Sequence, residues 1–230
     1  AYILVETRLA ADQVKATPLD RPEWVAVHPT SKDVYVALTN NNQRGKEFPI
    51  NAASPRENNQ MGHIIRWRPR QRDAANDRFD WEIFVLAGDP DNTDPNLKGN
   101  IRGDVFGSPD GLWFDQRGIL WTQTDISSGA LGKGAYARIT NNMMFAADPV
   151  TREFRRFLIG PNGSEVTGVD LTPDYKTMFV NIQHPGESPS ERSNPDKPKA
   201  VSDWPDRKLF SRPRSATIVI WREDGKPVGA

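Results

Sequence analysis

Apolar residues occur along this chain in short runs that are rich in Val, Ile, Phe, Trp and Tyr. Clusters of Gly, Pro, Asn and Asp separate the runs. Short apolar runs bounded by turn residues are typical of β-strands. No long stretch has a helical period, and the sequence predicts at most a short turn of helix from Leu9 to Val14. The pattern therefore predicts an all-β fold.

The predicted strands fall into groups of four. Groups of four antiparallel strands are the blade unit of a β-propeller, so the pattern favours about three four-stranded blades. The third group lacks an obvious fourth strand. The predicted strands are 25–27, 34–38, 63–68 and 81–87 in the first group, 111–114, 120–124, 142–147 and 153–158 in the second, and 168–171, 177–182 and 217–221 in the third.

The three groups also begin alike. In each, an apolar strand meets a turn of Pro, Asp or Gly and then a second apolar strand, as the first hairpin of a blade requires. A β-sandwich would use similar strands, so the repeat decides in favour of the propeller. The three beginnings are Glu23-Trp-Val-Ala-Val-His-Pro, Asp110-Gly-Leu-Trp-Phe-Asp and Thr167-Gly-Val-Asp-Leu-Thr-Pro-Asp.

Three blades do not close a ring. An open half would expose two apolar sheet faces, so we expect residues 1–230 to be one half of a propeller and to need the other half as a partner. The chain begins without Met or a basic and apolar leader, which is typical of a processed or trimmed protein.

Two long segments lie outside the predicted blades. Residues 40–62 form a polar loop, rich in Asn and Arg, between the second and third strands of the first group. Residues 185–214 form a Pro-rich insertion within the last blade, of the kind that is usually a surface excursion or a lid. Trp204 and Phe210 indicate that this insertion docks on the rest of the fold.

Charge and composition limit the partners. Lys plus Arg and Asp plus Glu both number 30, so nothing indicates binding to nucleic acid or to an anionic membrane. No apolar run approaches the ~18 residues of a membrane span. Cysteine is absent, so a metal would be held by oxygen donors or by the three histidines. Calcium or magnesium is the default expectation for such donors.

Three acidic residues stand just before the first strand of each group: Glu23, Asp110 and Glu165, the last of which is offset by two residues from the strict repeat. In a propeller these positions point towards the central channel, where the acids would repel one another. The usual relief is a bound divalent cation, so all three are predicted metal ligands. The alternative for each acid is to cap a turn or to bond backbone amides, and Asp110 in Ser-Pro-Asp-Gly is a good turn residue by itself.

Arg21 lies two residues before Glu23, so in an extended segment both side chains face the same way. An Arg beside a metal-bound carboxylate suits a phosphate or carboxylate ligand, because its planar fork grips two oxygens. The alternative is a plain surface ion pair between Arg21 and Glu23. Among the histidines, His28 and His63 are predicted to be structural, and His184 is the best placed near a site.

Six stretches are distinctive when taken together: Thr7-Arg-Leu-Ala-Ala-Asp, Asp20-Arg-Pro-Glu-Trp-Val-Ala-Val-His-Pro, Gly62-His-Ile-Ile-Arg-Trp, Trp81-Glu-Ile-Phe-Val-Leu-Ala-Gly-Asp-Pro, Ser108-Pro-Asp-Gly-Leu-Trp-Phe-Asp and Met178-Phe-Val-Asn-Ile-Gln-His-Pro-Gly-Glu. In this order, they closely resemble the second half of the PhoX alkaline phosphatase family. The resemblance runs from near Thr7 to near Trp221.

The resemblance implies a six-bladed propeller that hydrolyses phosphomonoesters, uses iron and calcium, and is exported to the periplasm or secreted through the twin-arginine route. It implies that Glu23, Asp110 and Glu165 are metal ligands and that Arg21 is the catalytic, phosphate-gripping arginine. The family's bridging cysteine and several acidic ligands lie in its first half. Residues 1–230 would then be the C-terminal half, active only together with the N-terminal half.

Two other functions are consistent with the strand pattern. A calcium-dependent lactonase or esterase of the gluconolactonase type shares six blades, axial acids and Pro-Asp-Gly-Leu turns, but it lacks the Arg-Pro-Glu-Trp start and the Gln-His-Pro-Gly-Glu turn. A non-enzymatic interaction propeller would use its acids only to cap turns, and it would need no metal.

Overall fold

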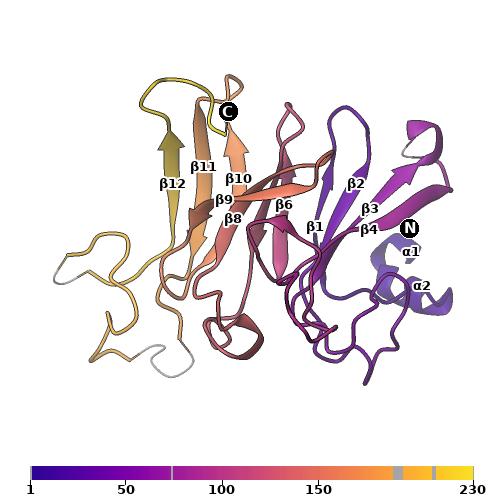
Figure 1. The fold of residues 1–230 in the computed structure, drawn as a ribbon, viewed down its shortest axis with the longest axis horizontal. Helices are drawn as coiled ribbons and strands as arrows, with labels where there is room; N and C mark the ends of the chain where they lie inside the picture. Colours follow the sequence, from indigo (N-terminus) through magenta and orange to yellow (C-terminus); the bar gives the residue numbers. More distant parts are fainter. Residues whose placement is uncertain (1, 74, 189–193, 209–210, 230) are drawn as a thin grey trace.

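The computed structural model describes residues 2–73, 75–188, 194–208 and 211–229. They form three mainly antiparallel sheets that lie side by side (Figure 1). The first two sheets follow the chain in simple up-and-down order. The first sheet holds β1 (Pro22–Val27), β2 (Val34–Leu38), β3 (His63–Pro69) and β4 (Phe79–Leu86), and the second holds β6 (Pro109–Phe114), β7 (Leu120–Thr124), β8 (Met143–Asp148) and β9 (Glu153–Ile159).

The third sheet has three strands, and its last one is separated from the others by the Pro-rich insertion. The short strand β5 pairs in parallel with β9 at the edge of the second sheet. Two short helices precede the first sheet. The remaining elements are β5 (Arg102–Gly103), β10 (Glu165–Leu171), β11 (Thr177–Gln183), β12 (Ala216–Trp221), α1 (Tyr2–Val5), α2 (Thr7–Gln13) and the 3₁₀ turns at Arg70–Arg72 and Gly134–Tyr136.

The all-β prediction is confirmed, and each predicted strand is present within a few residues of its predicted bounds. The predicted turn of helix corresponds to α2. Sequence reasoning missed α1, whose apolar residues are exposed, and it missed β5, which is too short to carry an alternating pattern. Among the described helices, none is long and apolar enough to cross a bilayer.

The first strands of the three sheets are neighbours. β6 contacts β1 on one side and β10 on the other. Each of these strands also carries a register shift: between Pro22 and Val25 in β1, between Pro109 and Leu112 in β6, and between Thr167 and Val169 in β10. A bulge re-aims the side chains on its strand without unpairing the rest of the ladder. The starts of all three strands are therefore brought together and individually oriented.

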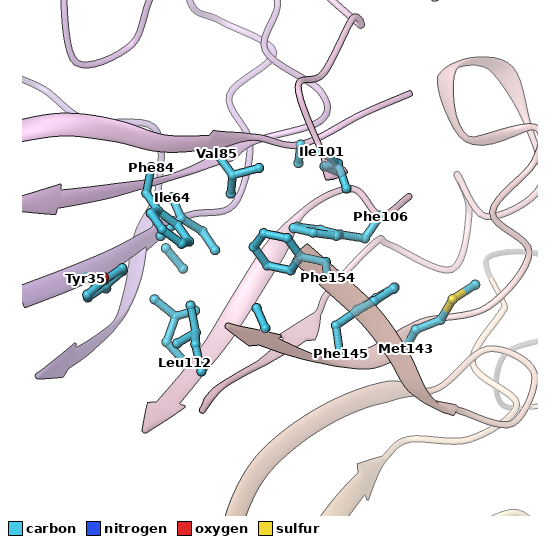
Figure 2. Close-up of a cluster of buried hydrophobic side chains, with 14 of the residues drawn as sticks. Tyr35, Ile64, Phe84, Val85, Ile101, Phe106, Leu112, Met143, Phe145 and Phe154 are labelled. Carbon is cyan, nitrogen blue, oxygen red and sulfur yellow. The ribbon is translucent and has the colours of Figure 1, made fainter. Parts of the chain in front are cut away.

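Two apolar clusters hold the sheets against each other. Between the first and second sheets, aromatic rings pack together, with centroids 6.2 Å apart for Phe84 and Phe154 (Figure 2). The ring centroids of Tyr35 and Phe114 are 4.9 Å apart. Between the second and third sheets, the fully buried Trp121 packs with Val180 and other apolar side chains. Because interiors are close-packed, these contacts fix the relative position of the three first strands.

The outward faces of the first and third sheets remain apolar and open. Val25 and Trp81 on the first sheet are 58% and 44% exposed, and Phe179 and Trp221 on the third sheet are 40% and 66% exposed. Exposed aromatic and aliphatic side chains in such numbers mark faces that pack against another surface.

The insertion leaves the third sheet between β11 and β12 (Figure 1). Trp204 packs against the apolar cluster between the second and third sheets, so the prediction that the insertion docks is confirmed at this residue. Phe210, the other residue named for this role, lies outside the described residues.

A buried polar network anchors residues 40–62 beneath the start of β1. The side chains of Asp20 and Arg44 are both fully buried, with Arg44 Nε donating to Asp20 Oδ1 at 2.8 Å. Asn59 Nδ2 donates to the other carboxylate oxygen at 2.9 Å. A buried charge is tolerated only when it is paired and hydrogen-bonded, and here both conditions are met. The loop and the residue before Arg21 are therefore one rigid unit.

His63 completes this network as a neutral ring. Asn59 Nδ2 lies 3.1 Å from Nδ1, and Nε2 lies 2.7 Å from the carbonyl oxygen of Ala53. Since an amide nitrogen donates and a carbonyl accepts, the proton sits on Nε2. Burial lowers the pKa of His63 to about 4. The prediction that His63 is structural agrees with this position.

His63 makes the fold sensitive to mild acid. Its pKa is lower in the folded chain than the value of about 6.5 in an unfolded chain, so protonation favours unfolding. The stabilisation is complete above pH 6.5 and is lost as the pH falls towards 4. Between pH 7.5 and pH 5, the free energy of unfolding should drop by about 2 kcal/mol more in the wild type than in His63→Gln, as measured by urea denaturation. Equal pH dependence in the two proteins would contradict this.

Candidate metal and anion site

Arg21 and Glu23 lie at the start of β1, at its bulge. Arg21 has a positive φ of 49°, a backbone conformation that is costly for a residue with a side chain. Its Nη2 donates to Glu23 Oε1 at 3.2 Å, and its Nη1 donates to Asn40 Oδ1 at 3.2 Å. The side chain is half exposed, and three of its five N–H donors are unused by these two bonds.

Asp110 is the most buried acid of the site and lies in the bulge of β6. In the part of the chain that the structure describes, its carboxylate makes no hydrogen bond and no ion pair. Burial, followed by the negative charges of Glu23, Glu165 and Asp125, raises its pKa to about 7 against the opposing effect of Arg21. Ser108, two residues earlier, has a positive φ of 51°.

Glu165 begins β10 and has two close neighbours at the end of β11. Gln183 Nε2 donates to Glu165 Oε2 at 2.7 Å, and His184 Nε2 lies 3.6 Å from the same oxygen. Burial raises the pKa of Glu165, and the charge of Asp125 adds to this effect. The other ring nitrogen of His184 lies 3.5 Å from Glu187 Oε2. His184 is therefore part of the site, as its place in the sequence suggested.

Sequence reasoning missed Asp125, which follows directly after β7. Burial raises its pKa, and the charges of Glu23 and Glu187 contribute, while Arg21 and His184 oppose them. Asp125 is thus close enough to interact electrostatically with the charged groups of this site, including Asp110 and Glu165, whose pKa values it raises. The sequence gives little reason to single out Asp125, because an Asp directly after a strand is an ordinary turn residue.

The structure brings Glu23, Asp110 and Glu165 into one electrostatically coupled group, together with Asp125. They come from all three sheets, and each pKa shift among them that has a resolved direction is upward. Like charges held together in a partly buried place favour a bound cation, and carboxylate oxygens are what calcium prefers.

Among the described residues, no group of three or more His, Asp or Glu side chains is close enough to enclose a metal ion. The donors fit a calcium site in their chemistry, and they supply only part of a coordination shell. The turn-capping alternative is not supported for Asp110, since within the described chain its carboxylate bonds no backbone amide. The Arg21–Glu23 ion pair does exist, but it occupies only part of the guanidinium.

Comparison with known proteins identifies the class of molecule. Residues 1–186 match the family described as alkaline phosphatase PhoX. The chain belongs to the PhoX family of alkaline phosphatases. The resemblance of the six sequence stretches to this family is confirmed.

The solved structure of Pseudomonas fluorescens PhoX in complex with vanadate, a transition state analogue, superposes with a TM-score of 0.87 and 43% identity. The match covers 99% of this chain and 38% of that one. A gluconolactonase from Xanthomonas campestris matches with 13% identity over 74% of this chain and 57% of its own, and its TM-score of 0.33 is too low to support an argument. A comparison with curated proteins finds no match.

If the acids repel one another, removing one should stabilise the metal-free protein. The pKa of Asp110 is higher in the folded chain than in an unfolded one, so its ionised form costs stability increasingly as the pH rises from about 4 to above 7. At pH 8 with a chelator present, Asp110→Asn should raise the free energy of unfolding by about 1–3 kcal/mol.

The matched control is Asp80→Asn, at an exposed position of β4, which should change the free energy of unfolding by less than about 0.5 kcal/mol. If Asp110→Asn destabilises the chelated protein, then Asp110 is a structural turn residue and the repulsion is unimportant.

Proposed function

We propose that the chain forms part of a metal-dependent alkaline phosphatase that hydrolyses phosphomonoesters and releases inorganic phosphate. The observation that carries this proposal is the juxtaposition of a half-exposed guanidinium, Arg21, with a coupled cluster of carboxylates. The carboxylates can bind cations, and the planar guanidinium can donate two parallel hydrogen bonds to an anion. Both are needed to bind a phosphate ester, and the PhoX family membership gives the reaction class.

The cluster's part is to hold the metal. Glu23, Asp110 and Glu165 are the proposed ligands in this chain, with Asp125 beside them. Calcium agrees with their oxygen donors, and iron is expected from the family resemblance. Bound cations would neutralise the charge of the phosphoryl oxygens and activate a nucleophile.

Arg21 acts on the phosphoryl group directly. Glu23 and Asn40 orient its guanidinium, and the remaining N–H donors can bind two phosphoryl oxygens. In the transition state, charge is spread over the equatorial oxygens, where such donors stabilise it most. The binding of vanadate by Pseudomonas fluorescens PhoX supports a phosphoryl-transfer site in this fold.

The complete enzyme needs more than residues 1–230. We infer that this chain is the C-terminal half of a six-bladed β-propeller, with residues 185–214 as an insertion in the last blade, and that activity requires the N-terminal half. The adjacent first strands, the apolar outer faces of the first and third sheets, and the 38% coverage of the Pseudomonas protein support this view. Export by the twin-arginine route to the periplasm or medium is expected from the same resemblance.

The alternatives have less support. A lactonase of the gluconolactonase type would not need Arg21 beside the cluster, and paired assays with a phosphomonoester and a sugar lactone would separate the two enzymes. A non-enzymatic interaction propeller would not need a buried, unpaired carboxylate such as Asp110, and metal analysis of the complete protein would distinguish it.

Glu23 tests the metal assignment. In the complete protein, Glu23→Gln should lower the metal content and the activity together, because the amide keeps the shape but removes the charge that binds the cation. Metal content is measured by elemental analysis. Glu153→Gln, at an exposed ion pair with Arg155, is the control and should retain both properties. If Glu23→Gln leaves the metal content unchanged, Glu23 is only the ion-pair partner of Arg21.

Arg21 tests the anion assignment separately. Arg21→Lys keeps the charge but loses the fork, so kcat/KM for phosphomonoesters should fall about ten- to a thousand-fold. Metal content should not change, because Arg does not ligate cations. Inhibition by inorganic phosphate should weaken as well. Arg155→Lys, at a side chain that is 77% exposed, is the matched control. If Arg21→Lys alters neither turnover nor phosphate inhibition, the proposed role is wrong.

A further inference from the structure

A cavity of about 590 Å³ opens beside Arg21. Part of its lining comes from the Asn-rich loop of residues 40–62, in which the proposed chemistry gives a role to Asn40 alone. Its lining also includes Ser127, Ala130 and the buried Tyr136. Carboxamides dominate the loop side of the cavity: Asn40, Asn41, Asn42, Asn58 and Gln60.

Most of these carboxamides have unused hydrogen-bonding atoms. Asn40 is engaged at both ends, with Arg21 and with Ser108. In Asn41 and Asn42, each Oδ1 accepts a bond from Gln43, and each Nδ2 has no protein partner within the described residues. In Asn58 and Gln60, neither the side-chain oxygen nor the side-chain nitrogen has a hydrogen-bond partner within the described residues. The wall therefore presents both donors and acceptors to whatever enters the cavity.

The charge of the cavity restricts its ligand. Arg21 is the only charged side chain in the described lining. A second phosphate or a polyanion would lack further cations to pair with. An aryl or acyl group would cover the amides without offering them hydrogen-bond partners, which disfavours its binding. A neutral molecule with many hydroxyl groups satisfies both donors and acceptors, since each hydroxyl can donate and accept.

The wall is rigid before any ligand arrives. Asn41 N donates to Asn59 O at 2.7 Å, and Asn58 N donates to Arg44 O at 2.9 Å. Arg44 and Asn59 are both held by the buried carboxylate of Asp20. A preorganised wall loses little conformational entropy on binding, so its hydrogen bonds contribute to affinity more fully. The Asp20 network thus serves Arg21 and the cavity at the same time.

We propose that this cavity binds the alcohol portion of the substrate and favours polyhydroxylated leaving groups, as in sugar phosphates and polyol phosphates. The inference rests on the proposed phosphatase function, because it places the phosphoryl group on Arg21 and the alcohol in the cavity next to it. Gln60 and Asn42 contact the hydroxyl groups, and they select the substrate without taking part in phosphoryl transfer.

The test compares two substrates in the complete enzyme. The double variant Asn42→Leu with Gln60→Met keeps the side-chain volumes but removes the polar atoms. We expect the ratio of kcat/KM for a hexose 6-phosphate to kcat/KM for p-nitrophenyl phosphate to fall about ten- to a hundred-fold, as for the loss of two hydrogen bonds. Competitive inhibition by the free hexose should weaken in parallel.

Gln116→Met is the matched control. Gln116 is an exposed glutamine in the turn between β6 and β7, and its variant should keep the wild-type substrate ratio. An unchanged ratio in the double variant, or an equal fall for both substrates, would overturn the cavity assignment while leaving the phosphatase function in place. If the wild type hydrolyses neither phosphate ester, the proposed function itself fails, and the assignment of the cavity fails with it.

Discussion

The structure depends on apolar packing that holds mutually repelling carboxylates together where the three sheets meet. Apolar packing between the sheets places the starts of β1, β6 and β10 next to one another. The acids at those starts are then forced together in a partly buried place, where their charged forms are poorly solvated. The raised pKa of the Asp110 carboxyl reflects this cost, first through burial and then through the charges of the neighbouring acids. Hydrophobic burial thus stabilises an arrangement that electrostatics alone would disperse.

The backbone at the candidate site also adopts conformations that cost free energy. Arg21 and Ser108 have a positive φ just before β1 and β6, and His184 has one just after β11. A residue with a side chain adopts this conformation at a cost on the order of 1 kcal/mol or more, and it persists only where the surroundings over-determine it. Here the surroundings are the buried Asp20 network below Arg21 and the bond between Ser108 and Tyr136. Strain and charge are concentrated together, as expected of a functional site.

The strands could be predicted from the sequence because apolar burial leaves a periodic trace in it. Glu23, Asp110 and Glu165 were proposed as ligands because they stand near the starts of the first strands, and that role stays a prediction. Asp125 was missed because it comes after a second strand, and only the packing of the sheets shows which strand ends face the others. The amide-lined cavity was missed for a different reason. Asn42 and Gln60 lie in an irregular loop, where no period relates sequence position to direction in space. The same limit applies to Asp20 and Arg44, whose pairing depends on tertiary contacts.

The bulges at the starts of β1, β6 and β10 have a consequence for how such a site can change. Beyond each bulge the ladder continues in register, so the apolar faces that pack between sheets keep their alternation. Within the bulges of β1 and β6, Glu23 and Asp110 are aimed independently of that alternation, whereas Glu165 lies in a regular stretch of ladder before the bulge of β10. The chemistry at the strand starts is therefore modular with respect to the core. Substitutions there leave the apolar faces unchanged, but each one alters the pKa of the neighbouring acids, so the acids of the site must change together.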